Sequence, residues 1–212
     1  MAQLFTVHPE NPQPRLIRQA AEIARAGGLI VYPTDSCYAL GCRIGDKAAM
    51  ERIRAIRGVD DRHHLTLVCR DLAEIGQYAR VDNSQFRLLK TATPGSFTFI
   101  LQATREVPRR LMHPKRRTIG LRVPDHNVTQ ALLADLDEPL LSSTLILPGD
   151  EQPLNDVNEM RSRLERRVDA ILDAGSCGIV PTTVIDMTGD TPVVLRRGKG
   201  KPELFGTADS NV

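Results

Sequence analysis

Short apolar segments alternate with helical stretches along this chain, and the series ends in two β-rich segments joined by a tight turn. The strand-like segments, which are apolar and rich in β-branched or aromatic residues, are 29–32, 65–69, 96–103, 118–123 and 140–147. Apolar residues recur at helical spacing in 13–26, 46–57, 71–76, 83–90, 124–136 and 155–166. Residues 182–186 and 193–196 flank Gly189-Asp190 and predict a hairpin. This irregular alternation favours an α/β fold with one twisted mixed sheet and helices packed around it over a purely parallel, doubly wound sheet.

The predicted helix over 46–57 has recognisable ends. Asp46 is a suitable N-terminal cap, and Gly58 ends the helical pattern. In the helix predicted over 83–90, the spacing places Phe86 and Leu89 on the inward face. Both helices are therefore expected to bury one apolar side.

Length and composition are those of one globular domain. The chain has 212 residues, of which 41% are hydrophobic and 25% charged, and the connections between predicted elements do not have the composition of a linker. We therefore expect residues 1–206 to form one domain and residues 207–212 to form a disordered tail. The apolar runs are too short to span a bilayer, and residues 1–9 lack a secretory signal, so we expect a cytoplasmic protein without a membrane partner.

The four cysteines do not form a recognisable disulfide or metal framework. They contain no Cys-x-x-Cys pair, and a chain of this length does not depend on disulfides, so reduced thiols are expected. Cys37 and Cys42 are separated by four residues, but no second pair or nearby histidine completes a metal site. We therefore predict no metal site and no tightly bound cofactor.

Residues 31–42, VYPTDSCYALGC, place a polar turn directly after a buried strand. Ligands in open α/β sheets usually bind at the carboxyl ends of strands, which is where the Thr34 hydroxyl and the backbone N–H groups of this turn would lie. An ordinary polar turn between two core elements explains the same residues, because Pro, Asp and Ser are common in turns. Other segments must decide between these interpretations.

Positive charge is concentrated in one connection, although the net charge of the chain is only +2. Seven cations and one acid, Glu106, lie within eighteen residues; the cations are Arg105, Arg109, Arg110, Lys115, Arg116, Arg117 and Arg122. A solvated basic face is one interpretation, and phosphate binding is the other. Because the stretch has no aromatic residue to stack on bases, it favours contact with the phosphates of double-stranded RNA. The residues that we predict to bind RNA are Arg109, Arg110, Lys115, Arg116 and Arg117.

Five sequence blocks together resemble one protein family. Residues 31–42 are similar to the pattern YPTxTxYGLG of YrdC-like proteins, which include threonylcarbamoyl-AMP synthases. The other similar blocks are PGSFTFIL at 94–101, TIGLRVPDH at 118–126, PTTVID at 181–186 and VLRRG at 194–198. Residues 56–72 and 140–149 most resemble the YciO branch of this family. The resemblance covers nearly the whole chain and implies the YrdC-like fold with a concave basic cleft.

The resemblance also implies ligands and a reaction. Synthases of this family combine threonine and bicarbonate into a carbamate, which attacks the α-phosphorus of ATP and expels pyrophosphate in a pathway of tRNA modification. The implied ligands are therefore ATP or AMP, a small amino acid (threonine), tRNA or double-stranded RNA, and Mg²⁺ that accompanies ATP. By the same resemblance, Thr34, Arg122 and Thr182 bind the amino acid, and Thr118 and Arg196 bind the nucleotide.

The two arginines in these blocks also admit structural roles. Arg122 lies between Leu121 and Val123 in a predicted strand, so its side chain projects to the opposite face, where a guanidinium can bind carboxylate or phosphate. A structural salt bridge explains Arg122 equally well. Arg196 ends a strand beside Arg197, where a solvated surface pair competes with phosphate binding as the explanation.

Two blocks depart from the synthase pattern. Synthases carry a Lys-x-Arg pair and a Ser-x-Asn pair, which hold the triphosphate and the reacting carboxyl. Arg57 and Val59 occupy the first pair here, and Thr144 and Ile146 occupy the second. Each lost donor would cost about a hundredfold in rate or more, so the resemblance predicts a weak or altered enzyme in which Arg57 and Thr144 are the catalytic residues.

The sequence therefore leaves two functions open. In the first, Arg57, His63, Thr118, Thr144 and Arg196 bind ATP and support a synthase-like reaction, with His63 or His64 supplying donors to phosphate; a solvent-exposed loop also explains these two histidines. In the second, the chain keeps the cleft without the chemistry and serves as a double-stranded RNA-binding or ribosome-binding factor in translation. Turnover requires ATP, threonine and bicarbonate together, whereas RNA binding requires none of them and weakens steeply with salt.

Overall fold

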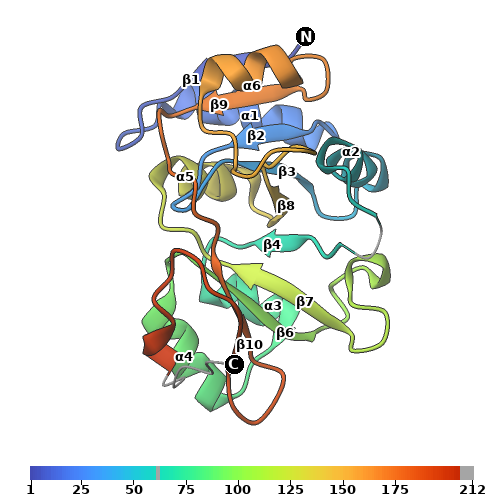
Figure 1. Ribbon diagram of the computed structural model, residues 1–212, viewed down its shortest axis with the longest axis vertical. Coiled ribbons are helices and arrows are strands. Elements are labelled where there is room, and N and C mark those ends of the chain that lie inside the picture. Colours follow the sequence, from blue (N-terminus) through green and yellow to red (C-terminus); the bar gives the residue numbers. More distant parts are fainter. Residues whose placement is uncertain (61–62, 206–212) are drawn as a thin grey trace.

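One mixed sheet runs through the computed structural model, which describes residues 1–60 and 63–205 (Figure 1). The tail predicted at 207–212 lies outside the described residues. Within them, the strands of the sheet are β1 (Gln3–Thr6), β2 (Ile30–Tyr32), β3 (Ala39–Arg43), β4 (Thr66–Val68), β5 (Ala79–Arg80), β6 (Phe97–Ala103), β7 (Thr118–Arg122), β8 (Leu140–Thr144), β9 (Ala170–Asp173), β10 (Thr183–Asp186) and β11 (Val193–Arg196). The helices are α1 (Pro14–Arg25), α2 (Lys47–Arg57), α3 (Leu72–Tyr78), α4 (Asn83–Ala92), α5 (Asn127–Leu136) and α6 (Val157–Leu164), with short 3₁₀ helices η1 (Arg109–Leu111) and η2 (Pro202–Phe205).

The strand order is β1-β9-β2-β3-β8-β4-β7-β6-β10-β11, and β5 pairs with β6. The parallel pairs are β1 with β9, β9 with β2, β4 with β7, and β6 with β10. The remaining pairs are antiparallel, including the predicted hairpin of β10 and β11. The mixed sheet that the alternating pattern predicts is confirmed, because parallel and antiparallel neighbours follow one another across it.

Two apolar layers cover the two faces of this sheet. Successive side chains of a strand point to opposite faces, so Val31 of β2 packs in the core cluster that contains Ile53 of α2. Its neighbours Ile30 and Tyr32 pack in the second cluster, with the buried alanines of α1 and the leucines of α5. Figure 1 shows α1 and α5 near one another beside β2 and β3. These helices pack beside β2 and β3, and they do not cover the whole of the other central strands of the sheet.

Helix α2 has the ends that the sequence predicts, and they position its last residue. The Asp46 side chain accepts a hydrogen bond of 2.9 Å from the backbone N–H of Ala49. Gly58 follows the helix with φ 63°, in the left-handed region that favours glycine. The chain therefore turns sharply after Arg57, and this residue stays at the rim of the sheet.

Several details differ from the predictions. Phe86 is 47% exposed, because α4 makes its core contacts one turn later, at Leu89 and Ala92. Helix α5 begins at Asn127 instead of Pro124, after an extended stretch. Strands β1, β3, β5 and β9 were not predicted, and β1 has a single buried residue, Phe5. No helix in residues 1–60 and 63–205 is long and apolar enough to cross a membrane.

Candidate functional site

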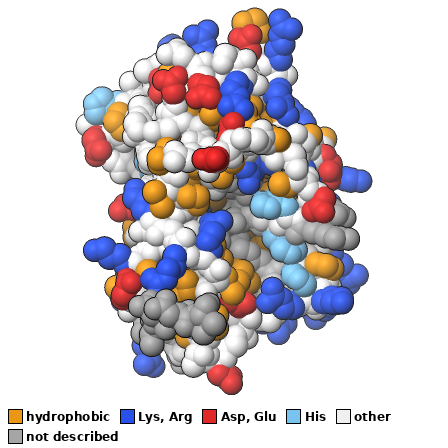
Figure 2. Space-filling view, viewed as in Figure 1, with side chains coloured by type: hydrophobic (Ala, Val, Ile, Leu, Met, Phe, Trp, Pro, Cys, Tyr) orange, Lys and Arg blue, Asp and Glu red, His pale blue; other side chains and the backbone are white. Residues whose placement is uncertain are grey.

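A cavity of about 220 Å³ opens over the central strands, on a face that carries several small and polar residues among apolar ones. Alternate positions of a strand share one face, and this spacing places four sets of residues on the floor of the cavity. They are Thr66 and Val68 of β4, Thr98 and Ile100 of β6, Thr118, Gly120 and Arg122 of β7, and Ser142 and Thr144 of β8. Figure 2 shows the hollow on this side of the molecule.

Gly120 keeps the centre of the floor open. A Cβ atom at this position would lie 3.3 Å from Thr66 Oγ1 and 3.4 Å from Thr98 Cγ2. A side chain would therefore crowd both threonines and occupy the space above β7. The glycine in the TIGLR segment thus has a packing role at the cavity, in addition to its place in a strand.

The charge of the cavity is positive. Four arginines line it, and none of the described lining residues is acidic; the arginines are Arg57, Arg116, Arg122 and Arg196. Two partners of these arginines, Asp35 and Asp186, lie outside the lining residues. A small cavity with several guanidinium groups favours an anionic ligand.

Arg57 is brought against the β8 end of the cavity. Its Nε donates a hydrogen bond of 3.1 Å to Ser143 Oγ, and its Nη1 donates to the backbone oxygen of Ile146. Burial lowers the pKa of Arg57 from its ordinary value, but an arginine remains charged at neutral pH. The two segments that depart from the synthase pattern, around residues 57 and 144, therefore meet at one place, although Val59 is not among the described residues that line the cavity.

Arg122 takes part in a buried ion pair and also lines the cavity. Its Nη2 pairs with Asp35 Oδ1, and its Nη1 donates to Ser36 Oγ at 3.3 Å. Ser96 Oγ donates to the other oxygen of Asp35 at 2.7 Å. The Nε of Arg122 is buried and has no hydrogen-bond partner among the described residues. The structural salt bridge that the sequence allowed is therefore present at the cavity surface, and ligand binding by Arg122 stays a prediction.

Thr182 and Arg196 lie together at the opposite side. The hydroxyls of Thr182 and Thr98 are 2.8 Å apart. Arg196 Nη2 donates to the backbone oxygen of Thr182 at 2.9 Å, and burial lowers the pKa of Arg196 from its ordinary value. Both residues line the cavity, as does Thr118. The backbone of Thr182 therefore orients Arg196, which is exposed at the cavity, and phosphate binding by this residue stays a prediction.

Thr34 is buried beneath the cavity and does not figure among the described residues that line it. Its Oγ1 donates to the backbone oxygen of Cys37 at 2.7 Å and accepts the N–H of Ser36 at 3.2 Å. The hydroxyl thus organises the turn that presents Asp35 and Ser36 to Arg122. Direct contact of Thr34 with an amino acid stays a prediction.

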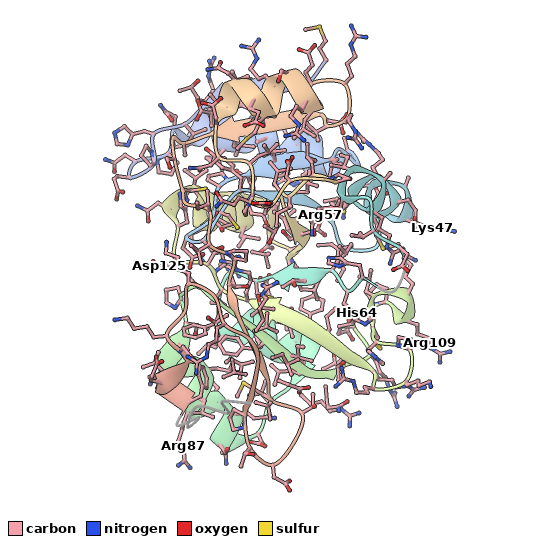
Figure 3. The ribbon with its side chains drawn as sticks, in the orientation of Figure 1. Lys47, Arg57, His64, Arg87, Arg109 and Asp125 are labelled. Carbon is pink, nitrogen blue, oxygen red and sulfur yellow. The ribbon has the colours of Figure 1, made fainter. Side chains whose placement is uncertain are left out.

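Three histidines line the end of the cavity that faces the basic connection. His64 and His113 have ring centroids 5.0 Å apart, and His63 lies beside them along the chain. Figure 3 shows His64 below Arg57, with Arg109 farther toward the outer edge. Burial lowers the pKa of both His63 and His64, and the nearby cations Arg57 and Arg54 lower the pKa of His63 further. His63 is half-buried, whereas His64 is exposed at the edge of the cavity, so the exposed loop that the sequence also allowed describes His64 but not His63.

The basic connection is exposed, but internal contacts hold part of it. Arg116 pairs with Asp186 at 3.2 Å, and Arg110 donates to the backbone oxygen of Gly45. The exposed residues of this stretch include Arg109, Arg110, Lys115, Arg116 and Arg117. Arg116 also lines the cavity, so the predicted RNA surface and the cavity share one residue.

Several cavity residues were missed by sequence reasoning. Ser142 and Thr98 occupy positions that alternate with Thr144 and Ile100 along their strands, and this alternation was a usable signal. His113 and Cys37 gave no such signal, because each stands alone in its segment. Burial raises the pKa of the Cys37 thiol, so it is a weak nucleophile. Among the described residues, no group of three His, Cys, Asp or Glu side chains is placed to hold a metal ion.

Comparison with known proteins places this architecture in a family. A family model described as telomere recombination, Sua5_yciO_yrdC, matches residues 22–198. YciO of Escherichia coli strain K12 is 58% identical over 205 residues, which cover 97% of the chain and 100% of YciO. The threonylcarbamoyl-AMP synthase of Halorhodospira halophila is 30% identical over 191 residues, which cover 89% of the chain and 98% of the synthase.

Two solved structures share the fold. The crystal structure of E. coli YciO matches with a TM-score of 0.93 and covers 97% of this chain and 100% of its own. P. abyssi Sua5 complexed with L-threonine matches with a TM-score of 0.84 at 26% identity, covering 92% of this chain and 57% of the Sua5 chain. The fold, the blocks of matching sequence and the extent of the family match agree, and the chain therefore belongs to the Sua5/YciO/YrdC family.

Proposed function

We propose that the cavity binds ATP and threonine and forms threonylcarbamoyl-AMP from threonine, bicarbonate and ATP. The observation that carries this proposal is the convergence of polar and cationic side chains from distant segments on one cavity without an acidic lining residue. The residues concerned are Arg57, Thr118, Arg122, Thr144, Thr182 and Arg196. Membership of a family that contains threonylcarbamoyl-AMP synthases supports the same reaction.

The reaction makes clear demands on such a cavity. The amino group of threonine adds to bicarbonate with loss of water, and an oxygen of the resulting carbamate attacks the α-phosphorus of ATP. The bond between the α-phosphorus and the oxygen that bridges to the β-phosphorus breaks, and pyrophosphate leaves. Negative charge grows on the phosphoryl oxygens and on the leaving group, so fixed cations and donors lower the barrier. Arg57 and Arg196 supply the cations, and Thr144 supplies a hydroxyl.

The two ends of the cavity suit different parts of the substrates. Arg122 and Thr182 suit a small amino acid, and Ser36 and Thr34, which lie outside the lining residues, shape the turn that holds Arg122. Arg57, Thr118, Thr144 and His63 suit the nucleotide and its phosphates, and Arg196, held at Thr182, suits a phosphate next to the amino acid. Mg²⁺ enters with ATP as part of the substrate, since phosphate oxygens and water are its usual ligands in such sites.

We expect slow turnover because of what lies beside Arg57. Ile146 presents an apolar side chain to the cavity, and its backbone oxygen accepts one N–H of Arg57. Val59 supplies no donor. Two of the five N–H groups of Arg57 are therefore already bonded to Ser143 and Ile146, and fewer remain to stabilise the transition state at the triphosphate.

Pyrophosphate release from MgATP tests the proposal, with threonine and bicarbonate each present or omitted. We expect release that requires both. Arg57→Met should lower the rate by about a hundredfold, because it removes a charge at the phosphates. Arg18→Met, on the exposed side of α1, should leave the rate unchanged and serves as the matched control. Release that does not depend on threonine or bicarbonate would contradict the proposed reaction.

A second candidate function is double-stranded RNA binding, and the exposure of the basic connection favours it. Lys115→Ala with Arg117→Ala should weaken binding of a double-stranded RNA and reduce the slope of log affinity against log salt by about one to two, since phosphate contacts release counterions. The matched control is Arg15→Ala with Arg18→Ala on α1. Equal affinities and slopes for both double variants would show that the connection is a solvated face.

A further inference from the structure

The histidines at one end of the cavity described above form a wall that this cavity shares with a second one. His63 and His64 line the main cavity and also a second one of about 400 Å³. Figure 2 shows histidine side chains together beside the hollow, with Lys and Arg side chains around them. The charged residues that line the second cavity are Lys47, Glu51, Arg54, Arg109 and Arg110. The wall therefore has cations on both sides.

The acids near this wall are already paired. Glu51 contacts Arg54 at 2.9 Å, and Asp186 contacts Arg116 at 3.2 Å. Asp60 lies close enough to His63 to raise its pKa, but burial and the cations around His63 outweigh it. Among the described residues, the cations around these histidines therefore outweigh the carboxylates.

His113 has a defined tautomer, and this gives it a fixed donor. Its Nδ1 accepts the backbone N–H groups of Lys115 at 3.3 Å and of Arg116 at 3.1 Å. A ring nitrogen that accepts carries no proton, so neutral His113 has its proton on Nε2 and donates from there. The turn therefore holds a neutral donor ring 5.0 Å from the ring of His64.

His64 differs from His113, because among the described residues no backbone N–H group of a turn is bonded to its ring in the way that fixes the His113 tautomer. Burial lowers its pKa, and the cations Arg116 and Arg54 lower it further. The imidazole is therefore neutral in the empty cavity at pH 7. An anion placed between His64, His113 and Arg116 reverses the local field, so that the charged form of His64 becomes the stable one.

We propose that His64, His113 and Arg116 form a phosphate-binding subsite that holds the terminal phosphates of a nucleoside triphosphate, and that His64 takes up a proton when they bind. The inference deepens the proposed function and rests on it only for the choice of ATP as ligand. Synthases have an arginine where this chain has Val59, and the proposed subsite supplies hydrogen-bond donors to phosphate from other segments of the chain. All three residues line the cavity, whereas their neighbours Lys115 and Arg117 do not, and this favours a nucleotide in the cavity over an RNA backbone lying on the connection.

Calorimetric titration with ATP, AMP and inorganic triphosphate tests the subsite without threonine or bicarbonate. Each ligand is titrated at pH 6 and pH 8, in two buffers of different ionisation enthalpy, so that the protons taken up per bound ligand are measured. Each ligand also binds and releases protons of its own, and this contribution is the same for every variant, so it cancels when variants are compared. The variants are His64→Gln, His113→Ala and, as matched control, His8→Gln, an exposed histidine whose Nδ1 also accepts backbone N–H groups.

The two subsite variants have different expected signatures. His64→Gln should lower the preference for ATP over AMP about tenfold at pH 6, change it little at pH 8, and abolish the difference in proton uptake. His113→Ala should lower the preference by a similar factor at both pH values, because a neutral donor is lost. His8→Gln should match the unmodified protein. Thermal unfolding of each variant reports whether it is folded.

Three outcomes would overturn the subsite. The first is an ATP preference and a proton uptake that His64→Gln leaves unchanged; this variant removes no backbone contact of the turn, so it decides the matter even if His113→Ala unfolds. The second is equal binding of ATP and AMP by the unmodified protein, and the third is no binding of ATP and triphosphate at all. Proton-linked ATP binding without pyrophosphate release would instead overturn the proposed reaction and leave the subsite standing.

Discussion

At the scale of single residues, Arg122 shows how one side chain serves both stability and the site. It joins the turn after β2 to β7 through Asp35, and both side chains are 9% exposed. A buried pair of this kind contributes little compared with apolar residues of equal size, but it becomes costly when one partner is removed. If Arg122 is removed, the carboxylate of Asp35 stays buried without a counter-charge, and the wall of the cavity loses the side chain that shapes it.

Arg122→Met should lower the free energy of unfolding by about 3 to 5 kcal/mol, because Asp35 would stay buried without its cation. Urea unfolding measures the change. The double variant Arg122→Met with Asp35→Asn removes the lone charge and should recover part of the loss. A double variant no more stable than Arg122→Met would show that the ion pair is not the source of the effect.

At the scale of elements, helix α2 delivers Arg57 to the cavity, and the turn after the helix fixes where the residue ends up. Gly58 has φ 63°, and a Cβ there would lie 2.6 Å from Pro148 Cγ. Pro148 belongs to the segment that follows Ile146, the partner of Arg57. The turn and its contact with 148 thus hold the two altered motifs in register.

Gly58→Ala should destabilise the protein and weaken ATP binding, since the new methyl group pushes α2 and residue 148 apart. Gly149→Ala is the matched control: its φ is 87°, but a Cβ there meets nothing within 4 Å. Backbone strain alone should cost the control about 1 to 2 kcal/mol. Chemical unfolding and ATP titration of both variants separate strain from collision; equal effects on ATP affinity would argue against the positioning role.

The elements were largely predictable, whereas their meeting points were not. The cap at Asp46 and the stop at Gly58 are local signals, and both are confirmed. Phe86 was placed inward wrongly, because helical spacing does not say which turn of α4 reaches the core. The contact between Arg57 and Ser143 depends on the pairing of strands far apart in sequence, and local patterns carry no information about that register. The place of His113 at the cavity likewise depends on contacts between segments far apart in the sequence, and local patterns did not predict it.

At the scale of the whole molecule, titration of the half-buried His63 and His126 and of the more exposed His64 links stability to pH. Burial lowers the pKa of His63, His64 and His126 below the ordinary value near 6.5. The unfolded chain therefore binds more protons than the folded one below that pH, and the free energy of unfolding increases with pH until the unfolded histidines have lost their protons.

We therefore expect the ligand-free protein to gain stability between about pH 5 and pH 6.5, from this contribution, and to level off above. Urea unfolding across this range, compared between the unmodified protein and His64→Gln, measures the share of one histidine. His8→Gln should follow the unmodified curve. A curve for His64→Gln that rises as steeply as the unmodified one would show that this imidazole does not titrate differently on folding.

The position of β9 between β1 and β2 has a consequence for how the chain is made. β9 pairs with both strands, yet its residues, 170–173, are synthesised long after them. On the ribosome, the first two strands emerge early and wait with unpaired edges until most of the chain has followed. Folding of this sheet therefore cannot proceed steadily from the first residue onward, and the nascent chain needs protection of those edges until synthesis is nearly complete.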